Sequence, residues 1–209
     1  MALELALALL ALAVAVALRP WRLLRTASGS ISPLATPLLA MLVVLPWLWA
    51  LPALHKSPLQ LQWSGAVLVL LMMGWPLAMP VFAAVAAVAW LIAPIDATQA
   101  VSLAVWQGVV PATLALALGA LLRRFLPHHP MVYVLGRGFL GAVLCLFVAG
   151  VLSQWTGHAL PGVDPNLGLV ARWLMAWGDA FVTGMLCAIF VAFRPQWLLT
   201  WSDARYLRS

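Results

Sequence analysis

Long apolar segments alternate with short polar loops along this chain. Five segments are apolar almost without interruption, and they cover residues 1–18, 33–54, 99–121, 131–155 and 167–193. About 20 residues rising 1.5 Å each cross the roughly 30 Å hydrocarbon core of a bilayer, so each segment is predicted to be a membrane-spanning helix. The loops between them are rich in Pro, Gly, Arg, Asp and Asn, which favour turns and helix ends. The pattern predicts an all-α, polytopic membrane helix bundle.

A sixth apolar segment, residues 58–93, is too long for one crossing. As one straight helix it would extend about 54 Å, more than tilt in the membrane accommodates. Gly74-Trp75-Pro76 lies at its middle, and proline removes a backbone donor and clashes with the preceding turn. The sequence therefore predicts two short helices, 58–74 and 76–93, with Gly74 and Pro76 as the hinge.

Two basic loops indicate how the helices are oriented. One follows the first span and the other follows residue 121, and their arginines are Arg19, Arg22, Arg25, Arg123 and Arg124. By the positive-inside rule both loops are cytoplasmic, so the chain between them crosses the membrane an even number of times. Two clear spans lie between the loops, and two further crossings by 58–93 are the economical answer. The prediction is one integral membrane domain over 1–209, with seven spans, the N-terminus outside and the C-terminus inside a plasma (bacterial inner) membrane.

Composition narrows the classes of function. Hydrophobic residues make up 66% of the chain and charged residues 8%, against roughly 45–50% and about 25% in a soluble domain. The polar stretches are too short for a soluble domain, so ATP-driven chemistry would need partner chains. The net charge of +6 comes mostly from arginines beside apolar segments, which indicates orientation in the membrane rather than nucleic-acid binding. Since no HExxH, CxxC pair or glycine-rich phosphate loop occurs, neither an enzyme nor a metal site is predicted.

Asp179 is the candidate for a functional site. It lies about twelve residues, or about 18 Å, from the outer end of the last span, near mid-membrane. A carboxylate there costs at least about 2.5 kcal/mol, so it should face the bundle interior and meet a partner, a cation or water. Two interpretations stay open: a cation or proton site on a transport path, or a hydrogen-bonded node that holds helices together. Arg137 is the candidate partner, although it lies about 9 Å into its span and could instead extend to the headgroups.

Small residues predict where helices approach closely. Gly138 and Gly141 lie on one small-residue surface, and Gly178 and Gly184 lie on the last span. Without a Cβ at such positions, two helix backbones can pack against each other in a membrane. These four glycines are therefore expected to serve helix packing.

Three segments resemble a known family. Gln62-Trp-Ser-Gly65 with Gly74-Trp-Pro-Leu-Ala78 is similar to the His-x-x-Gly-Ala and Gly-x-x-x-Ala helix pair of the membrane permeases of energy-coupling-factor transporters, cobalt/nickel branch. Residues 126–142 resemble the helix entry of a subgroup of predicted integral membrane proteins in that superfamily. Residues 178–207 resemble that subgroup's ending, in which an acidic residue precedes Gly-Met and the motifs aromatic-Arg-Pro-x-Trp and Asp-x-x-Tyr-Leu follow.

The resemblance implies a substrate-capturing component that works with a coupling membrane subunit and cytoplasmic ATPases. Metal-binding members begin Met-His, whereas this chain begins Met1-Ala2, and the histidine that opens the later motif falls on Gln62. The acidic residue of the ending is present as Asp179 in place of the more usual Glu. The resemblance thus makes Asp179 and Gln62 expected substrate-binding residues, and Arg137 joins them as the candidate partner of Asp179, for a transition-metal ion or another small solute.

Two functions follow as alternatives. The first is the substrate-binding permease component of an energy-coupling-factor-type transporter, which predicts a polar cavity containing Asp179 and Gln62. The second is a non-catalytic accessory or assembly subunit of a larger membrane complex, in which Asp179 and the glycines serve packing.

Overall fold

The computed structural model describes residues 1–24, 32–54, 63–127, 129–160, 162–164 and 167–206. In chain order the elements are α1 (Ala2–Ala17), η1 (Pro20–Leu24), α2 (Ala35–Leu54), α3 (Ala66–Ile92), α4 (Ala97–Leu103), η2 (Ala104–Val109), α5 (Val110–Phe125), η3 (Val132–Leu140), α6 (Gly141–Trp155), α7 (Gly168–Phe193), η5 (Pro195–Trp197) and α8 (Asp203–Tyr206). The turns η2 and η3 are π-helical and run directly into α5 and α6. Every element in the described part of the chain is helical.

Five helices of the described chain are long and apolar enough to cross a membrane. They are Ala35–Leu54, Ala66–Ile92, Ala97–Phe125, Val132–Trp155 and Gly168–Phe193. The sixth helix, α1, is also apolar but has 16 residues. The five uninterrupted spans expected from the sequence each coincide with an observed helix to within a few residues. The prediction of an all-α membrane bundle is therefore confirmed.

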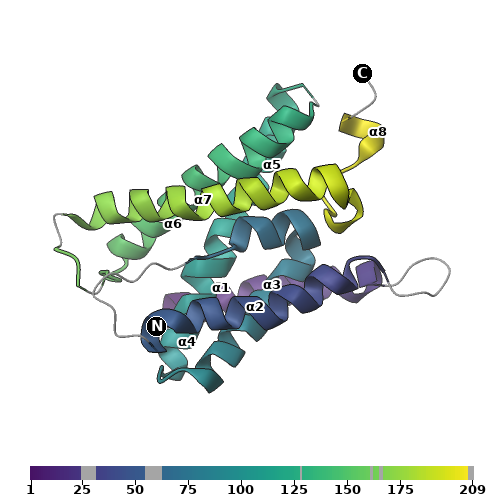
Figure 1. Ribbon diagram of the computed structural model, residues 1–209. Helices are drawn as coiled ribbons and strands as arrows, with labels where there is room; N and C mark the ends of the chain where they lie inside the picture. The colour runs from purple at the N-terminus through teal and green to yellow at the C-terminus, as the bar shows by residue number, and fades with distance from the viewer. Residues whose placement is uncertain (25–31, 55–62, 128, 161, 165–166, 207–209) are drawn as a thin grey trace.

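Helix α3 forms the centre of the bundle. It contacts α1, α2, α4, η2, α5 and α7, which surround it in Figure 1. In its most apolar stretch 78% of the residues are buried, against 33–39% in the other four long helices. A helix that is apolar on all sides is expected in such a position, because every face contacts another helix rather than lipid.

The predicted break at Gly74 is confirmed. Gly74 has φ 70° and ψ 163°, far outside the helical range, and divides α3 into two helices. This conformation is essentially restricted to glycine. Pro76 follows in the first turn of the second helix, where its missing N–H would have had no intrahelical partner.

The chain reverses direction at this break. Residues 66–73 run alongside α7 toward the segment that follows α7. Residues 75–92 run the opposite way, against α5, which points toward the same end of the bundle as α7 (Figure 1).

The first of the two predicted helices is shorter than expected. The sequence places it over 58–74, but the helix begins at Ala66 and residues 63–65 are not helical. Positions 58–62 lie outside the described residues. A left-handed Gly65, with φ 64°, directly precedes the first helical residue. The backbone N–H groups just before Ala66 bond to the Asp179 side chain instead of continuing the helix.

The glycines expected to serve packing differ among themselves. A Cβ at Gly138 would lie 3.0 Å from the Sγ of Cys187, and one at Gly184 would lie 3.0 Å from the Cβ of a phenylalanine in η3. At Gly141 a Cβ would lie 3.1 Å from a leucine of α5. At Gly178 nothing lies within 4 Å, so the close packing expected there is not present. Helix contact explains three of the four glycines.

A closer contact, which the sequence does not reveal, lies at Gly108 of η2. A Cβ there would lie 2.6 Å from Cγ and 2.8 Å from Cβ of Phe82, which is fully buried and stacks on Trp49. We expect Gly108→Ala to lower the free energy of unfolding by about 1–3 kcal/mol, the usual cost of overpacking a core. Thermal unfolding in detergent measures this. Gly136→Ala is the matched control, since its Cβ would make only ordinary contacts at 3.7 Å; equal losses in both variants would contradict the expectation.

Asp96, which lies just before the span Ala97–Phe125, fixes the start of α4. Its Oδ1 accepts the hydroxyl of Thr98 at 2.6 Å and the N–H of Gln99 at 2.7 Å, while the Gln99 side chain accepts the N–H of Asp96. This is a capping box. The Thr98 hydroxyl and then the Gln99 N–H hold the pKa of Asp96 below its usual range, so the cap persists until the pH falls below that lowered value.

Candidate functional site: a polar cavity beside Asp179

Asp179 lies near the middle of α7, and its side chain is only 5% exposed. Its Oδ2 accepts the N–H of Ser64 at 2.6 Å and that of Gly65 at 3.3 Å, and its Oδ1 accepts the hydroxyl of Thr183 at 3.1 Å. Among the described residues no basic side chain forms an ion pair with it. Neutral hydrogen-bond donors therefore hold this buried carboxylate.

These bonds hold the two residues that lead into the short helix at 66–73, and the Ser64 hydroxyl oxygen in turn accepts the first helical N–H, that of Ala66, at 3.1 Å. The first N–H groups of a helix lack intrahelical partners, and a carboxylate also suits the positive end of the helix dipole. At the other end, the carbonyls of Leu71 and Met72 accept the N–H groups of Thr200 at 3.2 Å and Leu199 at 3.0 Å. Both ends of this helix are thus bound by α7 and the segment that follows it.

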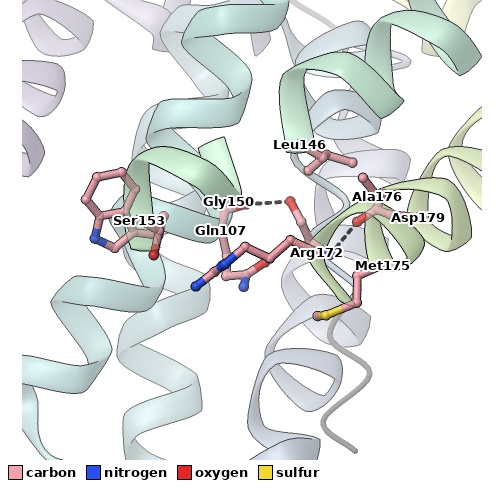
Figure 2. Close-up of a pocket in the computed structure, with 10 residues that line it drawn as sticks. Gln107, Leu146, Gly150, Ser153, Arg172, Met175, Ala176 and Asp179 are labelled. Atoms are coloured by element: carbon pink, nitrogen blue, oxygen red, sulfur yellow. Dashed lines mark hydrogen bonds between the residues drawn. The ribbon is translucent and has the colours of Figure 1, made fainter. Parts of the chain in front are cut away.

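A polar cavity of about 60 Å³ adjoins the Asp179 carboxylate (Figure 2). This volume has room for a few water molecules. The helices α7, α6 and η2 and the start of α3 form the walls. The lining residues are Ser64, Trp106, Gln107, Leu146, Gly150, Ser153, Arg172, Met175, Ala176 and Asp179.

Arg172 brings a positive charge to the same cavity. It lies two turns before Asp179 on the same face of α7, about 10 Å away along the helix axis. Its Nε donates to the side-chain oxygen of Gln154 at 3.1 Å, and a terminal nitrogen donates to the carbonyl of His158. The Arg172 stem packs on Gly150, where a Cβ would lie 3.2 Å from its Cδ. A guanidinium has five N–H donors, so these two bonds leave others for a solute.

A second buried acid, Glu4 of α1, lies next to the cavity. The Glu4 side chain is 5% exposed. The Nε2 atom of His158 lies 2.9 Å from one of the Glu4 carboxylate oxygens. The same oxygen accepts the indole N–H of Trp106, a lining residue, at 2.9 Å. The rings of Trp106 and His158 also contact each other, with centroids 5.9 Å apart. These contacts join α1, η2 and the loop after α6 at one side of the cavity.

The expected contact between Arg137 and Asp179 does not form. Arg137 lies against Gly119 and over the ring of Tyr133, rather than beside Asp179. Gln62 falls outside the described residues. Of the three, the structure places Asp179 alone at the cavity.

Cation ligands do not converge at this site. Within the part of the chain that the structure describes, no group of three or more His, Cys, Asp or Glu side chains could hold a metal ion. The groups that surround the Asp179 carboxylate are N–H and O–H donors, which favour a carboxylate that remains free of a cation. The arrangement suits a solute that forms hydrogen bonds.

Four polar lining residues were missed by sequence reasoning: Ser64, Gln107, Ser153 and Arg172. The spacing of Arg172 and Asp179, seven residues apart in one apolar helix, is a local signal that could have indicated a shared face. Ser64 and Gln107 gave no such signal, because both are brought to the cavity by the packing of α3 and η2 against α7.

No family model, no curated protein and no solved structure matches the chain.

Proposed function

We propose that this chain is the substrate-binding membrane component of a transporter and that the cavity beside Asp179 is its solute site. One observation carries the proposal: a broken helix starts inside the bundle, and its N-terminus meets a buried acid at the edge of a polar cavity. Interrupted helices whose ends face a polar site near the middle of the bilayer are typical of transporters. A purely structural bundle has no need to maintain such a cavity, because apolar side chains would fill it at lower cost.

The proposed topology has seven crossings, with the N-terminus outside. The chain reverses at Gly74, so 66–73 belongs to one crossing and 75–92 to the next. The arginines at the ends of α5 and α7, Arg123, Arg124 and Arg194, then lie on the cytoplasmic side, as the positive-inside rule requires. The cavity, with Arg172, lies toward the outer half of a plasma membrane.

The proposed solute is small and polar. Arg172 offers N–H donors, and Asp179 and Ser153 offer oxygen atoms, within a space of about 60 Å³. In this proposal a partner with ATPase activity supplies the energy, because the described elements are membrane helices and short connections. The resemblance to energy-coupling-factor permeases supports a coupling membrane subunit and cytoplasmic ATPases in this role.

Purification in mild detergent tests the proposal. We expect the full chain to copurify with ATPase subunits and to carry a small solute that mass spectrometry detects after denaturation. Ala176→Leu, which fills the cavity from α7, should lose the solute while keeping the partners. The control Ala120→Leu makes the same change on an exposed face and should lose neither. Copurification of oxidase or other complex subunits without ATPases would contradict the proposal.

A second function, that of an accessory or assembly subunit, has its own support. All the hydrogen bonds that the structure gives Asp179 are internal, so the carboxylate serves to hold α3 against α7 whether or not a solute binds. In that case no solute accompanies the chain, and Ala176→Leu alters only complex recovery.

A further inference from the structure

Among the described residues, no neighbour neutralises Arg137, which is a buried cation. Its side chain is 6% exposed, and its Nε and Nη1 have no hydrogen-bond partner. The ion pairs formed among the described residues involve Glu4, on the far side of the bundle, and not Arg137. A buried charge without a partner is strongly unfavourable, and a native structure tolerates it where a ligand supplies the missing counter-charge.

The surroundings of Arg137 hold the guanidinium in one place. A Cβ at Gly119 would lie 2.7 Å from Nη2 and 2.9 Å from Nε, so the missing side chain of this glycine makes room for the guanidinium. The ring of Tyr133 lies below it, with its centroid 5.2 Å from the guanidinium carbon. These contacts hold the plane of the guanidinium, a charged hydrogen-bond donor of the kind that binds phosphate and carboxylate groups.

A groove connects Arg137 to the end of the bundle at which α5 terminates. Its enclosed part measures about 10 Å³, room for about one oxygen-sized group. Arg123 contributes a second positive charge to the wall, and the exposed residues Leu126 and Pro127 provide an apolar rim. Two arginines beside an otherwise apolar groove at the end of a membrane helix suit the junction between a headgroup and its acyl chains.

We propose that this groove, with Arg137 at its inner wall and Arg123 beside it, binds a phosphate group. The phosphate belongs either to the headgroup of an anionic lipid or to a free phosphate in solution. The apolar rim favours the lipid, because acyl chains can pack against Leu126 and Pro127 whereas free phosphate has no apolar surface. This site is separate from the cavity beside Asp179 and does not depend on the proposed transport function.

Ligand-dependent unfolding of the full chain, in a maltoside detergent without phosphate groups, tests this proposal. We expect phosphatidylglycerol to raise the Tm, and diacylglycerol, which has the same acyl chains without the phosphate, to leave it unchanged. Arg137→Met keeps the side-chain stem and removes the charge; it should weaken phosphatidylglycerol binding at least about tenfold, the value of one charge-assisted hydrogen bond. Without lipid, this variant should be at least as stable as the natural chain, because the unpaired charge is gone.

Two further variants keep the test decisive. Arg123→Gln leaves the buried guanidinium in place and should also weaken binding, so it gives an answer even if Arg137→Met fails to fold. Arg124→Gln makes the same change in net charge on an exposed side chain outside the groove and should bind lipid like the natural chain.

Free phosphate is tested against sodium chloride at equal ionic strength. An Arg137-dependent rise of Tm with sodium phosphate, and none with phosphatidylglycerol, supports the site with a soluble ligand. Equal binding of phosphatidylglycerol by Arg137→Met and the natural chain overturns the proposal. Absence of stabilisation by either phosphate source also overturns it.

Discussion

Replacing Asp179 by alanine is expected to destabilise the bundle by at least about 2 kcal/mol. The change leaves the N–H groups of Ser64 and Gly65 buried without an acceptor, and each such group costs about 1–3 kcal/mol. Removing a buried charge offsets part of this loss. We expect the loss of acceptors to dominate, because the carboxylate already has three donors and its penalty is largely compensated. The Tm in detergent and the yield of monodisperse protein measure the effect.

Asp179→Asn is the informative companion to this variant. The asparagine oxygen can accept from Ser64 and Gly65, while its amide donates to the hydroxyl of Thr183, so the same contacts are satisfied without charge. We expect a Tm close to that of the natural chain. The Tm should thus distinguish Asp179→Asn from Asp179→Ala. An equally low Tm for both variants would show that the charge itself holds α3 to α7.

The same Asn variant separates the two candidate functions. If Asp179 is part of a solute site, Asp179→Asn should reduce the amount of bound solute although the protein remains folded and keeps its partners. If the chain is an accessory subunit, solute content has no meaning and only the recovery of the complex changes. Mass spectrometry of solute and partners in one preparation distinguishes these outcomes.

Gly74→Ala is expected to give the second large effect, a loss of about 2–4 kcal/mol in the free energy of unfolding. The backbone conformation of Gly74 is nearly exclusive to glycine and costs about 1–3 kcal/mol in another residue. In addition, the new Cβ would lie 2.8 Å from Cδ2 of Leu199, whose N–H bonds the end of the short helix at 66–73. Denaturant or thermal unfolding in detergent measures the change.

Gly178→Ala is the matched control for this substitution. It makes the same chemical change in the middle of α7, where no atom lies within 4 Å of the new Cβ. Because alanine favours a helix over glycine by up to about 1 kcal/mol, the control should be neutral or slightly stabilised. A loss at Gly74 no larger than at Gly178 would show that the break in α3 is not required for stability.

The sequence predicted the parts of the fold that depend on local pattern. Long apolar runs produce helices whatever their neighbours are, so the helical runs Ala35–Leu54, Ala97–Phe125, Val132–Trp155 and Gly168–Phe193 agree closely with expectation. The break at Gly74 was also predictable, since glycine readily adopts non-helical backbone angles and Pro76 removes a helical backbone donor two residues later. The length of the first part of α3 was not, because its start at Ala66 depends on a carboxylate 113 residues away in the sequence.

The candidate site was predictable in one residue only. A lone acid in an apolar membrane helix must be buried and hydrogen-bonded, because exposing a carboxylate to lipid costs free energy. This argument identified Asp179. Its partners are backbone N–H groups, and every residue except proline has one, so no side-chain pattern points to Ser64 and Gly65. Arg137 was the reasonable choice of partner by charge, but the helix packing at Gly119 places its guanidinium elsewhere.

By itself, then, the sequence determined that this protein is a bundle of membrane helices, that one helix breaks at Gly74, and that Asp179 must be buried. These features follow from transfer free energy and backbone geometry, which act on each segment separately. Only the tertiary structure decided that Asp179 binds the backbone N–H groups just before α3, that Arg172 shares its cavity, and that Arg137 lies in another groove without an ionic partner among the described residues. These relations depend on which helices lie side by side, and a nearly uniform apolar surface contains little information about that choice.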